Sequence, residues 1–224
     1  MQLSNDTLNV LKNFSLINPS VAIKPGKTIT TVSHQKSIMA KATIGDEFPS
    51  AGAIYDLNRF LGVLGLFEQP VLNFSPNHVK INGSAQSVDY RFADPDMIVK
   101  PEKDELNFPE TDVEVVLTQQ KIANVLRAAN VMQLPEIAIV GDVDITLEAI
   151  NTSDRGADCY KEKLLSNDTG HKFKFVFKTE NLKLMNFDYN CKITSRGISQ
   201  FTSQNDKGPK LIYWIAVEQN SEFS

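Results

Sequence analysis

Apolar side chains recur at helical spacing in three stretches of the chain. Leu8, Leu11 and Phe14 fall on one side of a helical wheel, and Ser4 stands before them as a candidate N-cap. The stretch after Asp56 repeats this pattern. The spacing predicts helices over residues 5–16, 57–64 and 118–130, and a short fourth helix over 179–184.

Runs rich in β-branched and aromatic residues lie between these helices, bounded by turn residues, and apolar and polar positions alternate along part of each run. In the first half they predict strands over 20–24, 28–33, 37–43, 70–74, 78–82 and 86–92. In the second half they predict strands over 112–117, 136–141, 143–150, 160–165, 173–178, 187–194, 197–203 and 211–218. Both halves therefore run helix, strands, helix, strands. This order favours two similar α+β domains, although the halves share no strong residue identity.

A proline-containing, acidic stretch separates the halves. Pro95, Pro101 and Pro109 are spaced through residues 93–111, among several aspartates and glutamates. Such a stretch is typical of a linker. We therefore predict an N-terminal domain over 1–108, linker included, and a C-terminal domain over 109–224.

Composition is that of a globular protein. The chain has 224 residues, 42% of them hydrophobic and 22% charged, with a formal net charge of −4. No apolar run approaches the roughly 20 residues that span a bilayer, and the first residues lack a signal-peptide pattern, so we expect a cytoplasmic protein. Cys159 and Cys191 are expected to be reduced, half-buried thiols. The scattered histidines lack metal-ligand spacing, so no metal or cofactor is expected.

The polar faces of the predicted helices lack carboxylates beyond their first turns. They carry Lys12, Arg59, Lys121 and Arg127 together with several Asn and Gln residues. One such face is usually an ordinary solvated surface, but four basic residues without an acid would arise by chance roughly once in twenty. A lining of this kind would hold DNA phosphates loosely, without reading base sequence.

No pattern in the sequence predicts catalysis. Pro25-Gly26-Lys27-Thr28 resembles the end of a phosphate-binding loop, but Val21 stands where that motif needs glycine. Cys159 has no histidine near it in sequence. The acid pairs Asp142/Asp144 and Asp94/Asp96 fall in predicted turns, where solvated side chains are commoner than Mg²⁺ ligands.

Three functional interpretations are open on this pattern. The first is a non-enzymatic DNA-encircling protein, which would use the basic helix faces. The second is a two-domain scaffold that binds a peptide or protein and makes no DNA contact. The third is a small metal-dependent hydrolase that would use the turn carboxylates. They differ in whether the basic faces share a surface and in whether activity depends on added metal.

Several short segments of the sequence resemble those of a known protein family. They are Leu3-Ser4 with Asp6-Thr7, Leu11-Lys12-Asn13-Phe14, Ile17-Asn18, Ala53-Ile54-Tyr55-Asp56-Leu57-Asn58, Phe60-Leu61-Gly62, Ala93-Asp94-Pro95, Val99 and Pro101. Leu126-Arg127 and Ile137-Ala138-Ile139 match more weakly. Together they make the chain resemble the sliding clamps of T-even-type tailed phages over nearly its full length.

The resemblance implies two processivity-clamp domains per chain, with sheets outside and helices lining a ring. It implies a homotrimer around double-stranded DNA, held without sequence preference, in the cytoplasm of the infected bacterial host. It also implies that an ATP-dependent clamp loader opens the ring and that the DNA polymerase docks on its outer face. The ring interface is expected to pair edge strands, for which 86–92 and 158–166 are the candidates.

The resemblance also carries site residues over by position. Lys12 and Arg127 are implied to face DNA, with Lys121 and Lys183 beside them. Arg59 rests on the charge pattern alone, because the family pattern varies there. A partner-peptide pocket near the linker and the C-terminal strand is implied at Met97, Ile98, Val99, Tyr213, Trp214, Ile215 and Val217. Core packing of Trp214 is an equally good interpretation of that residue.

Overall fold

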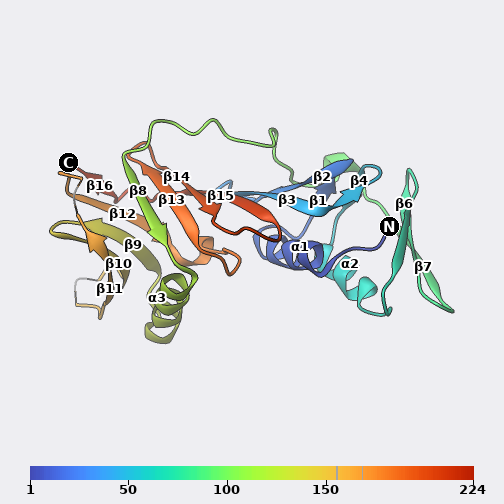
Figure 1. Ribbon diagram of the computed structural model, residues 1–224, viewed down its shortest axis with the longest axis horizontal. Coiled ribbons are helices and arrows are strands. Elements are labelled where there is room, and N and C mark those ends of the chain that lie inside the picture. Colours follow the sequence, from blue (N-terminus) through green and yellow to red (C-terminus); the bar gives the residue numbers. More distant parts are fainter. Residues whose placement is uncertain (155, 168) are drawn as a thin grey trace. The chain divides into compact units, whose positions relative to one another are not determined.

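The computed structural model describes residues 1–154, 156–167 and 169–224 (Figure 1). The chain divides into two compact units. The first comprises Met1–Leu106 with Asn205–Ile212, and the second comprises Asn107–Gln204 with Tyr213–Ser224. Along the chain, the break after Leu106 lies close to the predicted boundary at residue 108. The return of residues 205–212 to the first unit was not predicted.

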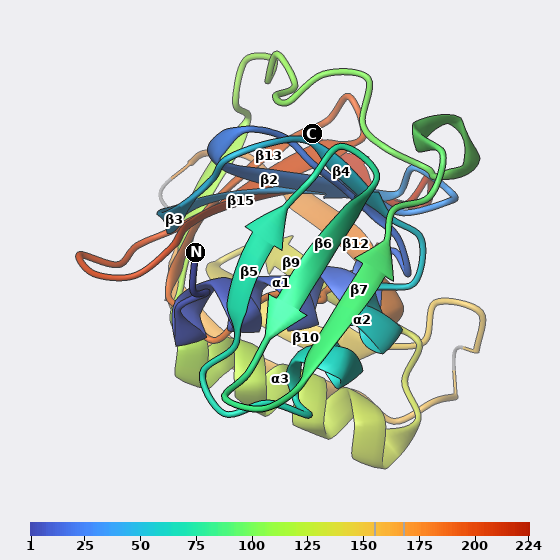
Figure 2. The same cartoon turned by 90° about the vertical axis from the view of Figure 1, so that its right-hand side faces the viewer.

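In chain order the first unit contains α1 (Asn5–Ile17), β1 (Val21–Ile23), β2 (Gly26–Val32), β3 (Ile38–Phe48), β4 (Gly52–Ile54), α2 (Leu57–Leu64), β5 (Val71–Phe74), β6 (His78–Asn82), β7 (Ser87–Arg91) and the 3-10 helix η1 (Pro95–Met97). Strand β1 pairs antiparallel with β2 and β4, and β2 pairs with β3, which gives the order β4-β1-β2-β3. Strands β5, β6 and β7 form a separate antiparallel sheet, seen face-on in Figure 2.

The strands of the small sheet keep the predicted alternation. Leu72, Val79 and Ile81 are buried on one face, whereas Lys80 and its cross-strand partner Asp89 are exposed on the other. Because successive side chains point to opposite faces of a strand, this pattern fixes which face packs inward.

The second unit contains β8 (Val113–Leu117), α3 (Gln119–Met132), β9 (Glu136–Gly141), β10 (Asp144–Ile150), β11 (Tyr160–Ser166), β12 (Phe173–Lys178), the 3-10 helix η2 (Thr179–Asn181), β13 (Tyr189–Thr194), β14 (Ile198–Ser203) and β16 (Glu222–Phe223). Strand β15 (Lys210–Ala216) runs across the division of the chain. One antiparallel sheet has the order β11-β10-β9-β12-β16, and in another β13 pairs with β8 and β14. Helix α3 packs on β9, β10 and β11.

Helix α1 begins at a polar network around its N-cap. Ser4 Oγ accepts from Thr7 N at 3.3 Å, and Asp46 Oδ2 of β3 accepts from Ser4 N at 2.7 Å and from Ser4 Oγ at 2.8 Å. Burial alone would raise the pKa of Asp46, but the hydrogen bonds from Thr7 and Ser4 outweigh it and lower the pKa. The network satisfies helix-end donors and fastens α1 to β3.

Helix α1 ends at Asn18, a fully buried residue. Its Nδ2 donates to Val32 O and to Val99 O, both at 2.9 Å, and its Oδ1 accepts from Ser20 N at 2.9 Å. One amide therefore joins the end of the helix, the end of β2 and the start of the linker.

Helix α2 begins after the predicted cap Asp56, whereas α3 begins after Thr118, which the sequence analysis placed inside the helix. Asp56 Oδ1 accepts from Arg59 N at 2.9 Å before α2, and Thr118 Oγ1 accepts from Lys121 N at 3.4 Å before α3. Helix α3 ends at Gln133, whose φ of 55° is left-handed and stops the helix. The predicted extents of all three helices are confirmed to within two residues.

The predicted helix over 179–184 is wrong in extent. Only Thr179–Asn181 is helical, as a 3-10 turn, and it ends at Leu182 with φ −84° and ψ 56°. Lys178 occupies the N-cap position without a side-chain cap bond, so the apolar spacing had no start signal to support it. Strands β4 and β16 and the turn η1 were not predicted, because each has only two or three residues.

The second unit has an aromatic core that also holds one of the cysteines. Tyr189 packs edge-on against Phe201 and Tyr213, with ring centroids 6.4 Å and 6.0 Å apart. Cys191 is fully buried and Cys159 is exposed, so neither is the half-buried thiol that we expected. Burial raises the pKa of the Cys191 thiol, which keeps it protonated and unreactive.

Asn18→Ala is expected to destabilise the chain by about 2–4 kcal/mol, because the carbonyl groups of Val32 and Val99 lose their donor and Ser20 N loses its acceptor. The free energy of unfolding in urea measures this. Asn9→Ala, at an exposed position of the same helix, is the control and should cost less than about 0.5 kcal/mol. A loss below about 1 kcal/mol for Asn18→Ala would show that water replaces the amide.

Asp46 should make the stability of the chain depend on acid pH. Its pKa is lower in the folded chain than its ordinary value of 3.8. The stabilisation is therefore fully present above that value and is lost as pH falls through the lower, folded pKa. Urea unfolding at neutral and at acid pH measures this. The decrease in the free energy of unfolding on acidification should be smaller in Asp46→Asn than in the wild-type chain. Glu47→Gln, an exposed neighbour, should keep the wild-type loss, and equal pH profiles for both variants would contradict the prediction.

Candidate nucleic-acid interface

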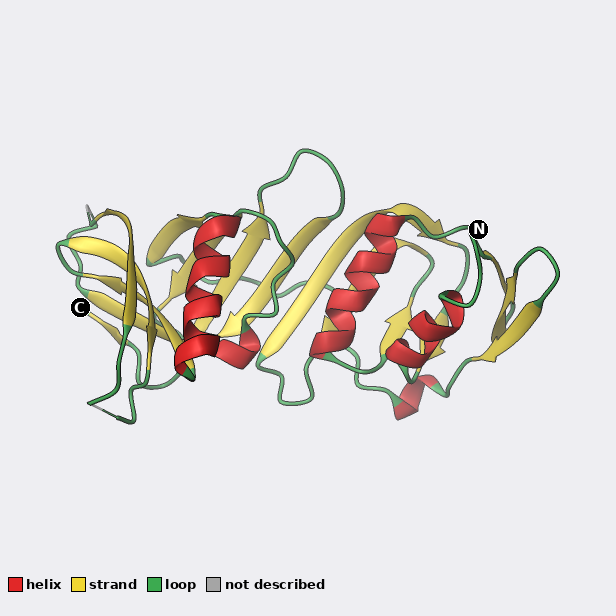
Figure 3. Cartoon of the chain, turned by 90° about the horizontal axis from the view of Figure 1, so that it is seen from below, coloured by secondary structure: helices red, strands yellow, loops and turns green. Residues whose placement is uncertain are grey.

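In the first unit, α1 and α2 pack on each other and present basic residues to solvent. Figure 3 shows both helices in front of the strands of this unit. Val10, Leu11 and Phe14 are fully buried, so Lys12 and the opposite face of α1 are left exposed. Arg59 is exposed in the first turn of α2. Among the described residues, neither Lys12 nor Arg59 takes part in an ion pair.

In the second unit, the polar face of α3 divides in two. Arg127 is exposed and has no ion pair within the described parts of the chain. Lys121, by contrast, donates from Nζ to the main-chain oxygen of Lys163 on β11 at 2.6 Å. Asn124 accepts from Gln120 at 2.8 Å and donates to Glu162 of β11 at 3.4 Å. The N-terminal half of this face is thus engaged with the strand beneath it.

Lys183 does not lie on a helix. It follows η2 in the irregular segment between that turn and β13, and its residue is half-buried. The structure thus presents Lys12, Arg59 and Arg127 on exposed helix faces, whereas Lys121 and Lys183 have other surroundings. Whether any of the five contacts DNA stays a prediction.

The helices are the part of the chain from which carboxylates are nearly absent. Asp6, in the first turn of α1, is the one acid in the sequences of α1, α2 and α3, against Lys12, Arg59, Lys121 and Arg127. The chain as a whole carries a net charge of −4. The helix faces are therefore suited to a polyanion although the protein is acidic.

The residues predicted for a partner pocket have different surroundings. Met97, which is 70% exposed, and the half-buried Val99 line a cleft of about 450 Å³ in the first unit, beside His34 and Tyr55. Ile98 is buried. Its lining is mixed, with Pro19 beside Met97 and Val99 and the polar residues Ser20, Asp56 and Asn58. A pocket role for Met97, Ile98 and Val99 stays a prediction.

In the second unit, Tyr213, Trp214, Ile215 and Val217 are all buried. The indole Nε1 of Trp214 donates to Gln200 Oε1 at 3.0 Å, which satisfies the polar atom of the ring. From the sequence, core packing and a pocket role were equally good interpretations of Trp214. The burial of its side chain favours packing. A pocket role for these four residues stays a prediction.

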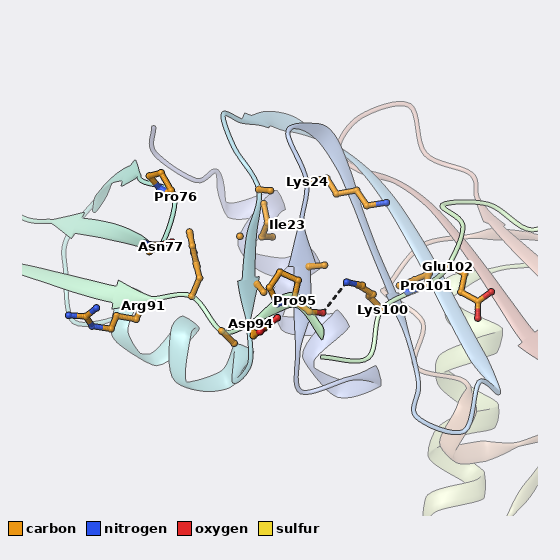
Figure 4. Close-up of a pocket in the computed structure, with 16 residues that line it drawn as sticks. Ile23, Lys24, Pro76, Asn77, Arg91, Asp94, Pro95, Lys100, Pro101 and Glu102 are labelled. Atoms are coloured by element: carbon orange, nitrogen blue, oxygen red, sulfur yellow. Dashed lines mark hydrogen bonds between the residues drawn. The ribbon is translucent and has the colours of Figure 1, made fainter. Parts of the chain in front are cut away.

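A larger cavity of about 1010 Å³ lies in the first unit beside the short strand β4 (Figure 4). Gly52 and Phe92 line it, and a Cβ at Gly52 would lie 2.6 Å from the Phe92 ring, so a larger residue there would require the ring to move. The Lys100 ammonium donates to Pro95 O at 2.9 Å across the linker wall of the cavity. No sequence signal identified this cavity, because its walls come from distant segments.

The acidic linker is fastened by ion pairs to two turns and one strand of the first unit. Asp104 pairs with Lys24 at 2.6 Å, Glu102 pairs with Lys36 at 3.7 Å, and Glu105 pairs with Lys41 of β3. Each of these lysines thereby has an acid beside it, unlike the lysine and arginines on the exposed helix faces.

The residues that might have supported catalysis have structural roles. Gly26 begins β2 with φ 108°, and Lys27 and Thr28 continue as strand, so no helix follows to hold a phosphate. Asp142 pairs with Lys172 and Asp144 with Lys163, both at 2.7 Å.

Within residues 1–154, 156–167 and 169–224, no group of three or more His, Cys, Asp or Glu side chains is arranged to hold a metal ion. None of the helices in that part of the chain is long and apolar enough to cross a membrane.

The two segments predicted for subunit pairing both contain a strand at the edge of its sheet. Strand β7 ends the order β5-β6-β7, and β11 begins the order β11-β10-β9-β12-β16. Each therefore has one side on which its backbone groups face no strand in the described chain.

Family models match both halves of the chain. Residues 4–99 match the family described as DNA polymerase processivity factor, and residues 114–219 match the C-terminal domain of the gp45 sliding clamp. The matched segments fall on either side of the acidic linker.

Whole-chain relatives have the same description. The chain is 32% identical to the sliding clamp of Vibrio phage KVP40, over 97% of this chain and 99% of that protein. It is 30% identical to the sliding clamp of Escherichia phage RB69 and 28% identical to that of Enterobacteria phage T4, in each case over 99% of this chain and 98% of the relative.

Solved structures share the fold at lower identity. The PCNA of A. fulgidus, solved with the C-terminal region of FEN-1 bound, superposes with a TM-score of 0.71 at 13% identity, over 98% of each chain. The PCNA2-PCNA3 complex from Sulfolobus tokodaii gives a TM-score of 0.70 at 12% identity, over 95% of this chain and 96% of that one. The predicted α+β fold of two clamp domains is thereby confirmed. With family models on both halves and relatives along its whole length, the chain belongs to the sliding clamps of T-even-type tailed phages, which are DNA polymerase processivity factors.

Proposed function

We propose that three copies of the chain close into a ring around duplex DNA and keep the replicative polymerase on its template. The observation that carries this proposal is the charge of the helix faces. Lys12, Arg59 and Arg127 are exposed there, and past Asp6 the helices contain no acid.

Sliding needs attraction that is weak and independent of sequence. Duplex DNA carries a negative charge about every 1.7 Å along its axis, so a carboxylate-free lining avoids repulsion at every position along the duplex. Isolated lysines and arginines hold phosphates through contacts that salt screens, and no base-reading constellation accompanies them. Retention would then come from topology, with the basic lining keeping the barrier to movement low.

The free edges of β7 and β11 support ring closure. Because they belong to different sheets of the chain, pairing β7 of one copy with β11 of the next would be a head-to-tail contact, which closes into a ring when the rotation allows it.

The remaining roles would be filled by partners. An ATP-dependent clamp loader would open the ring, and a segment of the polymerase would dock in the cleft beside Met97 and Val99. The clamp itself would carry out no reaction and would act in the cytoplasm of the infected host. Its contribution would be to keep the polymerase from diffusing away.

The mass of the chain in solution should rise with concentration to about three times 25.0 kDa. Light scattering behind a sizing column, over a range of loading concentrations, measures this. A chain that stayed at 25.0 kDa throughout would rule out ring closure without a partner and would favour a two-domain peptide-binding scaffold.

Replacing Lys12 and Arg127 together by Ala should weaken loader-dependent retention on circular DNA by roughly tenfold at physiological salt and lower its salt dependence, because phosphate contacts are lost. The trimer mass should not change. Lys80→Ala with Lys178→Ala removes the same number of exposed cations from strands and should leave retention as in the wild type. Loss of the trimer in the first variant would place those residues at the subunit interface instead.

A further inference from the structure

Tyr90 fastens the edge strand β7 to the first turn of α2. Its hydroxyl donates to the main-chain oxygen of Asp56 at 3.1 Å. Its ring packs edge-on against Phe60, with centroids 5.1 Å apart and planes at 73°. Asp56 also accepts from Arg59 N through its side chain and from Phe60 N through the same main-chain oxygen. One strand side chain thus reaches the residue that starts the helix carrying Arg59.

The surroundings of Tyr90 keep its hydroxyl as a donor. Burial raises its pKa first, and the charge of Asp56 raises it further, against the opposing effect of Arg59. The phenol therefore stays protonated at neutral pH, as the hydrogen bond to Asp56 requires. Tyr90 is half-buried, whereas Tyr55, one residue before Asp56, is 61% exposed.

An equivalent connection exists in the second unit with different residues. Lys121, in the first turn of α3, donates from Nζ to Lys163 O on the edge strand β11 at 2.6 Å. Asn124, one turn further along, donates to Glu162, which also accepts from Tyr160 OH at 2.8 Å. Here the helix reaches the strand, and again the contact is made at the first turn.

Edge strands are the parts of a sheet whose order depends most on a neighbour. With hydrogen bonds on one side only, β7 and β11 open more readily than central strands. A second copy of the chain paired along the free edge would supply the missing bonds and suppress that opening. A side chain that spans strand and helix would carry the added order into the first turn of the helix, because opening the strand breaks the same bond.

We propose that Tyr90 and Lys121 are positioning residues that couple subunit pairing at the edge strands to the order of the helices that carry Arg59 and Arg127. This inference rests on the proposed ring and deepens it. A separated chain would present loosely ordered cations, whereas the closed ring would present ordered ones. Lys121 would then act through β11, and its contribution to DNA binding would be indirect.

The test follows amide hydrogen exchange in two peptides, one covering residues 56–61 and one covering residues 118–124, over a dilution series. Light scattering reports the assembled fraction at each concentration. In the wild-type chain both peptides should exchange more slowly as copies assemble. Tyr90→Phe keeps the aromatic ring of the side chain and removes its hydroxyl. In this variant the decrease in exchange rate on assembly in 56–61 should shrink about fivefold, the effect of one hydrogen bond. The slowing in 118–124 should be unchanged.

Lys121→Met should give the reverse result, with a weakened response in 118–124 and a wild-type response in 56–61. Each variant thus serves as a control for the other unit. Tyr55→Phe repeats the chemical change of Tyr90→Phe at an exposed position beside the same cap and should behave as the wild type. A merely structural role would alter exchange equally at every degree of assembly.

Two outcomes overturn the inference, and they are distinguishable. If the chain assembles and both variants retain the wild-type change in exchange on assembly, the coupling is absent, but the proposed ring is still supported. If the mass stays at 25.0 kDa at every concentration, the proposed ring fails and the coupling fails with it.

Discussion

Each unit depends on burying one apolar helix face against a sheet. Val10, Leu11 and Phe14 of α1 have no exposed surface, and Val125 and Ala129 of α3 have almost none. This requirement fixes which side of each helix faces inward but leaves the composition of the outward side free. A lining without carboxylates can therefore be placed there with little effect on the core. The fold and the charge pattern are specified by different residues of the same helices, which is why a protein of net charge −4 can present faces suited to DNA.

The sequence predicted the elements whose signals are local. Helix α1 was predicted from its apolar spacing and from Ser4, and α2 from its spacing and Asp56, and the structure places both side chains as caps. Alternation along the strands predicted most of the sheet residues. The exposure of Lys12 and Arg127 follows from the same periodicity, since a face opposite a buried stripe must point away from the core.

Features set by long-range contacts could not be predicted in this way. The segment 205–212 belongs to the first unit although it is distant from it in sequence. The helical pattern predicted that Lys121 faces solvent, but its ammonium donates a hydrogen bond to the main-chain oxygen of Lys163, 42 residues away in sequence. Asn18 and Tyr90 were missed as connecting residues for the same reason. Nothing in the local sequence marks an amide or a phenol whose partners are supplied by the fold.

The ion pairs of the linker divide the cations of the first unit into two classes. Lys24 and Lys41 are neutralised by Asp104 and Glu105, whereas Lys12 has no acid beside it in the described chain. A lysine that is paired with the linker is occupied, whereas an unpaired one such as Lys12 is available to attract a polyanion. Both kinds of interaction weaken as ions are added. Ionic strength is thus a single variable that would loosen the linker from its sheet and DNA from the helices under the same conditions.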